Sequence, residues 1–165
     1  MITPESPRKL FLIDAYALIF RAYYAFIKNP RINSQGLNTS AIFGFTNAVL
    51  EVLRNERPTH IAVAFDAPGD TFRNELYPEY KANRDETPED IKRSVPFIQK
   101  VLEAFDIPII TLPGYEADDL IGYLAHAAAK EDFDVYMMTP DKDFGQLVTD
   151  RVKVFKPAKG GNPPE

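Results

Sequence analysis

Short apolar runs alternate with segments of helical periodicity along most of this chain, and that alternation limits the possible folds more than any other feature. The runs of strand length cover residues 9–14, 60–66, 107–112, 134–139 and 152–155. Strands and helices that alternate at these lengths indicate an α/β domain, because each helix returns the chain for the next parallel strand. We therefore expect a three-layer α/β sandwich with a mainly parallel central sheet.

The segments between these runs predict the helices. Helical patterns span about 16–27, 39–54, 87–105, 116–130 and 142–148. Thr39 and Thr87 each precede such a pattern as a capping residue, and Pro88 suits a first helical turn. Residues 67–87, hereafter the arch, are rich in aromatic and charged side chains without a clean period. We expect the arch to be an exposed, partly helical excursion after the second strand.

One domain is expected, because 165 residues with 45% hydrophobic side chains suffice for a single core. It covers residues 9–155, preceded by a flexible tail at 1–8 and followed at 156–165 by the patternless start of a linker. No run approaches about 18 consecutive apolar residues, so we expect neither a membrane span nor a membrane partner. The start of the chain lacks an apolar leader, which favours a cytoplasmic protein.

The charged residues restrict the chemistry. The sequence has no cysteine and only two histidines, so a bound metal ion is expected to be held by oxygen ligands. The net charge is −5, and the acids are concentrated, because residues 110–145 contain eight Asp or Glu and two Lys. Bound cations would neutralise such a cluster, so the negative net charge is compatible with a nucleic-acid partner.

Seven acidic side chains follow the predicted strands. They are Asp14, Asp66, Glu116, Asp118, Asp119, Asp141 and Asp143. The carboxyl ends of parallel strands share one edge of the sheet, where ligands bind, so these carboxylates are predicted to meet there. Neighbouring anions repel one another unless cations bind, and Mg²⁺ prefers such oxygen ligands. We predict that all seven are catalytic, metal-binding residues for two Mg²⁺ or Mn²⁺ ions that promote hydrolysis of a phosphodiester.

Each acid also has a purely structural interpretation. An aspartate at the end of a strand is often a turn or cap residue, and acids at the start of a helix interact favourably with its dipole. Glu116 and Asp119 share one face of the predicted helix, whereas Asp118 points elsewhere. A structural role explains one or two of the acids, but not acids after every neighbouring strand.

The arch carries a second pattern, in which basic and aromatic residues interleave. This pattern suits phosphate contacts together with base stacking on a single strand. The candidates for DNA binding are Arg73, Tyr77, Tyr80, Lys81 and Arg84. A solvated surface of mixed charge is the alternative, since acids such as Glu75 and Glu79 balance the cations. Arg21 is a further candidate for DNA binding, although the aromatic residues around it are typical of helix packing.

Four segments, in this order, closely resemble the 5′-nuclease domain of bacterial DNA polymerase I, which is similar to the flap endonucleases with their PIN-like fold. They are LIDAYALIFRAYYAF at 12–26, VAFDAPGDTFRNELYPEYKANR at 63–84, PGYEADDLIG at 113–122 and TPDKDFGQLV at 139–148. By this resemblance the seven acids match the family's metal-site acids. Arg73, Tyr80, Lys81 and Arg84 fall in the arch that family members use to engage the 5′ strand.

The resemblance implies metal-dependent hydrolysis of DNA at 5′ ends and 5′ flaps, and removal of RNA primers, in replication and repair. It also implies a C-terminal polymerase domain in a full-length protein, and we expect a monomer. Family members often have Gly where this chain has Ala15, a change of little expected effect. The family continues into further metal-site acids and a helix-hairpin-helix element that this sequence lacks. We therefore expect this chain alone to bind metal and DNA poorly and to cut slowly or not at all.

Two other functions remain open. A phosphoacceptor receiver domain also places aspartates around Mg²⁺ at the ends of parallel strands, but it usually pairs acids after the first strand, where this chain has only Asp14. A non-catalytic nucleic-acid-binding module would keep the acids merely as a surface. Metal-dependent stabilisation distinguishes that module from a metal site, because an ion that binds the native state raises the melting temperature.

Overall fold

Five parallel strands form one sheet in this computed structural model, which describes residues 6–82, 84–158 and 162–165. In the order β3-β2-β1-β4-β5, every strand pairs in parallel with its neighbours. The strands are β1 (Lys9–Asp14), β2 (His60–Ala64), β3 (Ile109–Ile110), β4 (Asp134–Met138) and β5 (Val152–Phe155). The predicted sheet is thus confirmed, and it is parallel throughout.

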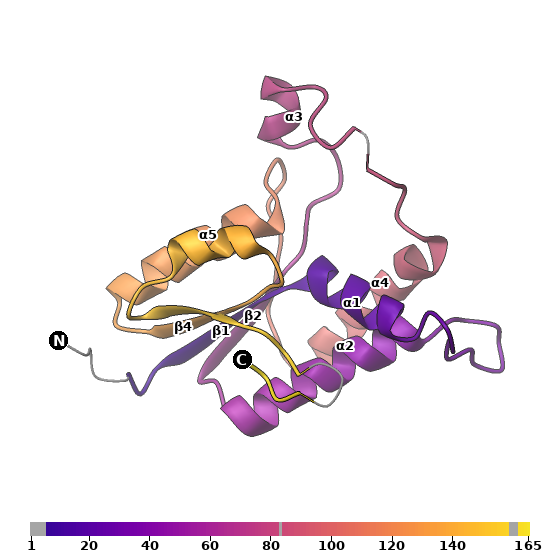
Figure 1. The fold of residues 1–165 in the computed structure, drawn as a ribbon, viewed down its shortest axis with the longest axis horizontal. Helices are drawn as coiled ribbons and strands as arrows, with labels where there is room; N and C mark the ends of the chain where they lie inside the picture. The colour runs from indigo at the N-terminus through magenta and orange to yellow at the C-terminus, as the bar shows by residue number, and fades with distance from the viewer. Residues whose placement is uncertain (1–5, 83, 159–161) are drawn as a thin grey trace.

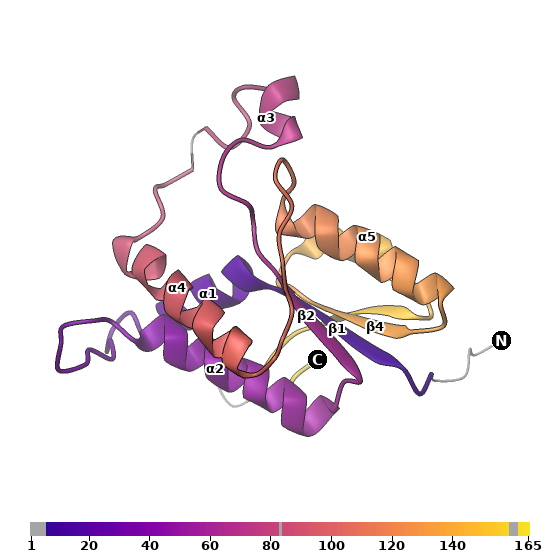
Figure 2. The same ribbon diagram turned by 180° about the vertical axis from the view of Figure 1, so that it is seen from behind.

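Helices cover both faces of this sheet and complete a three-layer sandwich (Figure 1, Figure 2). One face carries α1, α2 and α4, and the other carries α5 and the short 3-10 helix η2. Their bounds are α1 (Ala15–Ala25), α2 (Ser40–Glu51), α4 (Glu89–Ala104), α5 (Ala117–Lys130) and η2 (Lys142–Leu147). The π-helical turn η1 (Val52–Glu56) extends α2. Within the arch lies α3 (Phe72–Leu76), which stands away from the body of the domain in Figure 1.

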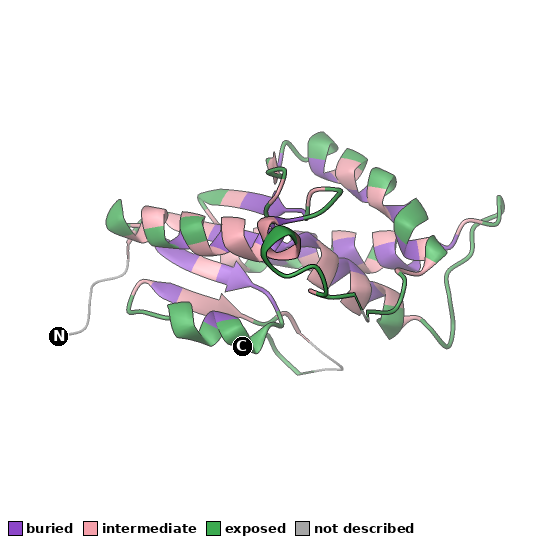
Figure 3. Cartoon of the chain, turned by 90° about the horizontal axis from the view of Figure 1, so that it is seen from above, coloured by how far each residue is buried: buried purple, intermediate pink, exposed green. Residues whose placement is uncertain are grey.

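The side chains of β1 alternate between two apolar cores. Phe11 and Ile13 are fully buried in the core beneath α1, α2 and α4, whereas Leu12 belongs to the core beneath α5. This alternation follows from the two-residue period of a strand, and burial of both faces explains why residues 10–13 of β1 are all apolar. Figure 3 shows buried strands inside and exposed residues on the outer sides of the helices. The rigid core therefore fixes the carboxyl end of β1.

A close approach of two helices positions α1. A Cβ atom added to Gly44 of α2 would lie 2.7 Å from the Cβ of Ala22 in α1, a separation that real side chains do not adopt. Glycine is therefore required here, and the backbone of α2 rests directly on α1. Because the side chain of Asp14 caps α1, this contact also helps to place Asp14 at the edge of the sheet.

The strand order places β1 and β4 side by side where the chain changes direction across the sheet. The chain runs outward from β1 through β2 to β3, then crosses to β4 and runs outward again to β5. Ligands bind at the carboxyl ends of the strands that flank such a point. Asp14 is the last residue of β1 and Asp141 shortly follows β4, so the topology brings both acids to this edge.

The structure corrects several predicted boundaries. The second strand ends at Ala64, so Asp66 lies in the following loop, and β3 contains only two residues of the predicted 107–112 run. An edge strand needs few backbone bonds, and β3 lies at one end of the sheet order, next to β2. The predicted cap Thr87 was wrong, because α4 begins after Pro88 without a side-chain cap bond.

Both ends of the domain make specific contacts. In the predicted flexible tail, the backbone N–H of Ser6 donates to Asp134 at 2.6 Å and the Arg8 guanidinium lies over the Phe133 ring. The rest of that tail, residues 1–5, lies outside the described residues. In the predicted linker, Lys156 and Glu165 exchange backbone hydrogen bonds. Across the described ranges, no helix is long and apolar enough to span a membrane.

Candidate functional site

Asp14 lies at the junction of β1 and α1, with only 9% of its surface exposed. Its carboxylate accepts a hydrogen bond from the backbone N–H of Ala17 at 3.2 Å and so caps α1. The pKa of Asp14 is raised to about 7, chiefly by burial and also by the nearby carboxylates of Asp118, Asp66 and Asp141, against the hydrogen bond from Ala17, which lowers it. The like charges named here come from three other segments of the chain.

Asp66, Asp118 and Asp141 lie close enough for their negative charges to act on Asp14. An oxygen of Asp66 accepts the backbone N–H of Ala117 at 2.6 Å, which ties the loop after β2 to the start of α5. Burial, followed by the charges of Asp141 and Asp66, raises the pKa of Asp118. None of the four residues forms an ion pair with any residue that the structure describes. Asp14, Asp66, Asp118 and Asp141 are hereafter the unpaired acids.

The unpaired acids fit a hydrated divalent cation in their chemistry. Among residues 6–82, 84–158 and 162–165, no three acidic or histidine side chains converge closely enough to hold a metal ion by themselves. Mg²⁺, however, keeps several waters and takes only one or two carboxylates directly, so a wider ring of carboxylates suits it. Each donor is a hard oxygen, and a bound cation would relieve the repulsion that raises the pKa values of Asp14 and Asp118.

Asp143 is exposed beside this group, in the first turn of η2. Its backbone N–H donates to an oxygen of Asp141 at 2.9 Å, so Asp141 caps η2. A second hydrogen bond runs from the backbone N–H of Asp141 to the hydroxyl of Thr139, a residue with 2% exposure. Thr139 therefore supports the loop of Asp141, a role that its position at the end of a predicted strand did not reveal.

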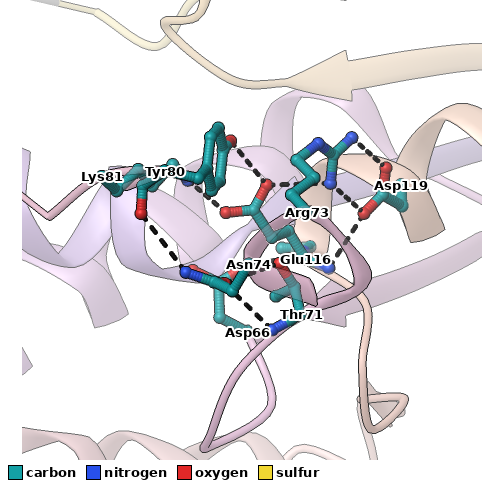
Figure 4. A network of polar contacts seen from close by, with 9 residues as sticks. Asp66, Thr71, Arg73, Asn74, Tyr80, Lys81, Glu116 and Asp119 are labelled. Atoms are coloured by element: carbon teal, nitrogen blue, oxygen red, sulfur yellow. Dashed lines mark hydrogen bonds and ion pairs between the residues drawn. The ribbon is translucent and has the colours of Figure 1, made fainter. Parts of the chain in front are cut away.

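Glu116 and Asp119 have a different environment, because both bind the arch (Figure 4). The Arg73 guanidinium donates to the two oxygens of Asp119 at 2.7 and 2.8 Å and to Glu116 at 3.0 Å. This paired hydrogen bonding lowers the pKa of Asp119. Within α5, Asp119 also accepts the backbone N–H of Glu116 at 3.0 Å in a capping box.

Two further arch residues contact Glu116. The Tyr80 hydroxyl donates to it at 3.2 Å, and the Lys81 ammonium forms an ion pair with it. Lys81 has a backbone φ of 57°, in the left-handed region, which is uncommon for a residue with a side chain. Burial lowers the pKa of Lys81, but the bond to Glu116 leaves it raised overall. Arg73, Tyr80 and Lys81 thus converge on one carboxylate at the start of α5.

Comparison with known proteins identifies the family. Residues 9–163 match the family described as 5′-3′ exonuclease, N-terminal resolvase-like domain. The chain belongs to this family. DNA polymerase I of Mycobacterium tuberculosis is 46% identical over 151 residues, which are 92% of this chain and 17% of that protein. A 5′-3′ exonuclease of Aquifex aeolicus is 38% identical over 150 residues, which are 91% of this chain and 51% of that protein.

A solved structure confirms the fold of this exonuclease family domain. The bacteriophage T5 flap endonuclease, in a pseudo-enzyme-product complex with DNA and metal ions, superposes with a TM-score of 0.64 at 24% identity. The match covers 95% of this chain and 57% of the T5 chain. The predicted PIN-like fold is therefore correct. Against these relatives the chain spans a sixth of the polymerase and about half of the shorter proteins.

The exonuclease domain contains arch supports that the sequence prediction missed. Thr71 and Asn74 form a capping box at the start of α3, and the Asn74 amide also donates to the backbone carbonyl of Tyr80 at 3.3 Å. The backbone N–H of Phe72 donates to the carbonyl of Gly114 at 3.0 Å, which fastens the base of the arch to the turn before α5. A Thr three residues before Asn was the available signal, since it resembles a capping box.

The remaining DNA-binding candidates lie apart from Glu116. Tyr77 is 59% exposed and its hydroxyl donates to Glu79 at 3.2 Å, while Arg84 is exposed on the arch. Arg21 donates instead to the backbone carbonyls of Pro157 and Ala158, and burial lowers its pKa. Of the six candidates, the structure brings Arg73, Tyr80 and Lys81 to the acids. The hydrogen bonds to these carbonyls direct the Arg21 side chain toward the chain after β5.

Proposed function

We propose that this domain hydrolyses phosphodiester bonds of DNA at 5′ ends and 5′ flaps with the help of divalent metal ions. One observation carries the proposal: four unpaired acids from separate segments lie at the ligand-binding edge of the sheet, beside an arch that presents cations. Carboxylates that form no ion pair with Lys or Arg can bind metal ions, and arginine and lysine side chains bind phosphate. Neither feature alone favours a nuclease over a metal-binding or nucleic-acid-binding module, but their adjacency supports a nuclease.

The residues of the chain divide the work. The unpaired acids would hold the metal ions, which supply a water of lowered pKa and stabilise charge on the phosphate. Asp14, fixed by β1 and by its bond to Ala17, would keep its orientation as the ion binds. Arg73 and Lys81 would orient the phosphate, and the exposed ring of Tyr77 could stack on a base.

The relatives supply the biological setting of the proposal. Their names are DNA polymerase I and 5′-3′ exonuclease, and the T5 complex contains DNA and metal ions. By analogy, the substrates are DNA with a 5′ end or flap and RNA primers on DNA, and the ions are two Mg²⁺ or Mn²⁺. We place the domain, as a monomer, in a bacterial cytoplasmic protein that also carries a polymerase domain and serves replication and repair.

Cleavage of a 5′-labelled flap DNA tests this function. The reaction is measured with Mg²⁺, with Mn²⁺ and with EDTA, for the wild type, for Asp118→Asn and for the control Asp132→Asn. Asp132 is a matched control, because it is exposed at the opposite edge of the sheet and its φ of 61° suits asparagine. Metal-dependent cleavage, slow in this chain and faster in a protein extended to the length of the exonuclease relative, is the expected result; it is lost in Asp118→Asn and kept in Asp132→Asn.

Melting temperature separates this function from its rivals. A site built from the unpaired acids predicts that Mg²⁺ raises the melting temperature of the wild type but not of Asp118→Asn. A rise without cleavage would indicate a metal-binding module that is not catalytic. No rise and no cleavage, both in this chain and in a protein extended to the length of the exonuclease relative, would refute the metal site and the nuclease together.

A further inference from the structure

A tight turn between β3 and α5 rises from the sheet edge beside the arch (Figure 1, Figure 2). The backbone N–H of Tyr115 donates to the carbonyl of Leu112 at 3.1 Å, and Gly114 between them has a φ of 83°. Pro113 and Gly114 are the residue types that a type II turn prefers at its two central positions. The turn therefore fixes the backbone of Tyr115 just before α5.

The ring of Tyr115 belongs to a short stack of side chains at the base of the arch. Its centroid lies 5.6 Å from that of the half-buried Phe72 ring, and the Arg73 guanidinium lies 4.6 Å from the Phe72 centroid. The backbone N–H of Phe72 donates to the carbonyl of Gly114 at 3.0 Å, which joins the arch to the turn. Neither the ring contact nor this hydrogen bond uses a carboxylate, so metal ions that bind the acids do not compete with them.

Tyr115 is the exposed member of this stack. It is 44% exposed, and Leu112 in the same turn is 46% exposed. An aromatic ring has few rotatable bonds, and here a rigid turn and a second ring already restrict it. Little conformational freedom is therefore lost when a ligand covers its exposed side. Such a ring is suited to bind one further flat group.

We propose that Tyr115 stacks on one unpaired base of the 5′ strand while cations of the arch hold a phosphate of the same strand. The proposal rests on the proposed nuclease function and deepens it by naming a base contact. The ring lies at the foot of the arch, which carries the cations Arg73 and Lys81, and it directly precedes the acids of α5. A single strand offers flat bases beside phosphates, which matches an aromatic ring beside cations. Stacking tolerates any base, so the contact would position strands of any sequence.

Fluorescence of 2-aminopurine, placed in turn at each unpaired position of a 5′ flap, reports the stacking. Ca²⁺ replaces Mg²⁺ in the titration to slow cleavage. We expect the wild type to quench one position, Tyr115→Phe to keep that quenching, and Tyr115→Ala and Tyr115→Leu to lose it. Tyr115→Leu keeps an apolar side chain without a π face, so its loss separates stacking from apolar packing.

A second exposed tyrosine supplies the matched control. Tyr123 is 74% exposed on α5 and has no ring contact among the described residues, so Tyr123→Ala should keep the quenching. Quenching that persists in Tyr115→Ala would overturn the proposal. Quenching that is lost equally in Tyr123→Ala would overturn it as well, because the effect would not be specific to the turn.

An abasic nucleotide at the quenched position removes the other half of the contact. The affinity for flap DNA should fall about tenfold in Tyr115→Ala, and about tenfold when the wild type binds the abasic flap. Both changes together should cost no more than either alone, because each removes the same contact. Losses that multiply to about a hundredfold would overturn the proposal, since the tyrosine and the base would then act independently.

Failure of the stacking and failure of the nuclease function give different results. Each measurement is made with this chain and with a protein extended to the length of the exonuclease relative. Metal-dependent cleavage by Tyr115→Ala, with an unchanged affinity for the flap, would overturn the stacking and leave the nuclease function standing. If neither protein binds or cuts flap DNA, both fail. The melting temperature of Tyr115→Ala should stay within about 2 °C of the wild type, because the residue is exposed, so a lost affinity does not reflect unfolding.

Discussion

Two groups of acids occupy the same edge of the sheet and behave oppositely. The unpaired acids have like charges as neighbours, so the pKa of Asp14 rises to about 7 and that of Asp118 also rises. Glu116 and Asp119 have arch cations as neighbours, and the bond from Arg73 lowers the pKa of Asp119. Residue type is therefore a poor guide to role, because the partners of a carboxylate decide whether it needs a cation.

Adjacent residues on α5 give the sharpest test of this contrast. We expect Asp118→Asn to reduce single-turnover cleavage of a 5′ flap about a thousandfold, because it removes a group that holds the metal ions. Asp119→Asn should reduce it only about tenfold, because it loosens the arch. Comparable losses in the two variants, measured by quenched-flow assays at saturating Mg²⁺, would erase the distinction between the groups.

The pH dependence of stability should reveal the unpaired acids. The pKa of Asp14 is raised from 3.8 to about 7 in the folded protein, so the folded state holds its proton more tightly than the unfolded chain. The resulting stability is complete below the unfolded pKa and is lost as pH rises through 7. Without metal, the free energy of unfolding of Asp14→Asn, relative to that of the wild type, should therefore rise by about 3 kcal/mol between about pH 5 and pH 8.

Urea unfolding in EDTA measures this difference. Saturating Mg²⁺ at about pH 8 should stabilise the wild type, because the ion favours the ionised carboxylate. The difference in unfolding free energy between the wild type and Asp14→Asn should then become smaller. A difference between wild type and Asp14→Asn that does not change with pH would show that burial and repulsion do not act on this residue.

Salt should distinguish the arch from the core. The side chains of Arg73 and Lys81 are each 31% exposed, so their ion pairs are partly screened by dissolved ions. We expect about threefold faster hydrogen exchange in residues 71–82 between 0.05 and about 1 M NaCl, with little change in β1. Equal sensitivity of both regions would mean that the arch is not held by charge.

The smallest expected effect concerns Asn74. Asn74→Ala removes the cap of α3 and the bond to the Tyr80 carbonyl, and should cost the arch about 1 kcal/mol of local stability. Global melting should stay within about 2 °C, because α3 has no buried residue. Chymotrypsin cleavage after Tyr80 provides the measurement, because the bond after Tyr77 precedes Pro78, and Asn33→Ala in the loop between α1 and α2 is the control. A resistance to cleavage equal to the wild type would remove Asn74 from the arch supports.

The sequence predicted the layers and the edge of this fold because strand length, helical periodicity and the position of the acids all depend on local pattern. It also predicted that Asp118 would face away from Glu116 and Asp119, since helical spacing alone decides that. It did not reveal which carboxylates are paired, because the Arg73 contacts join residues 43 and 46 positions apart. The hydrogen bond from Asn74 to the Tyr80 carbonyl and those from the Arg21 side chain to backbone carbonyls likewise depend on the tertiary structure.

The contact between Gly44 and Ala22 has a consequence for mutational tolerance at a distance from the acids. Any larger side chain at position 44 must push α1 away from α2, and the amino end of α1 carries Asp14. The side chains at positions 22 and 44 therefore compete for the same space, so a larger residue at one position is tolerated only with a smaller residue at the other. The position of Asp14 at the sheet edge thus depends on a steric limit between α1 and α2, at a distance from the acids.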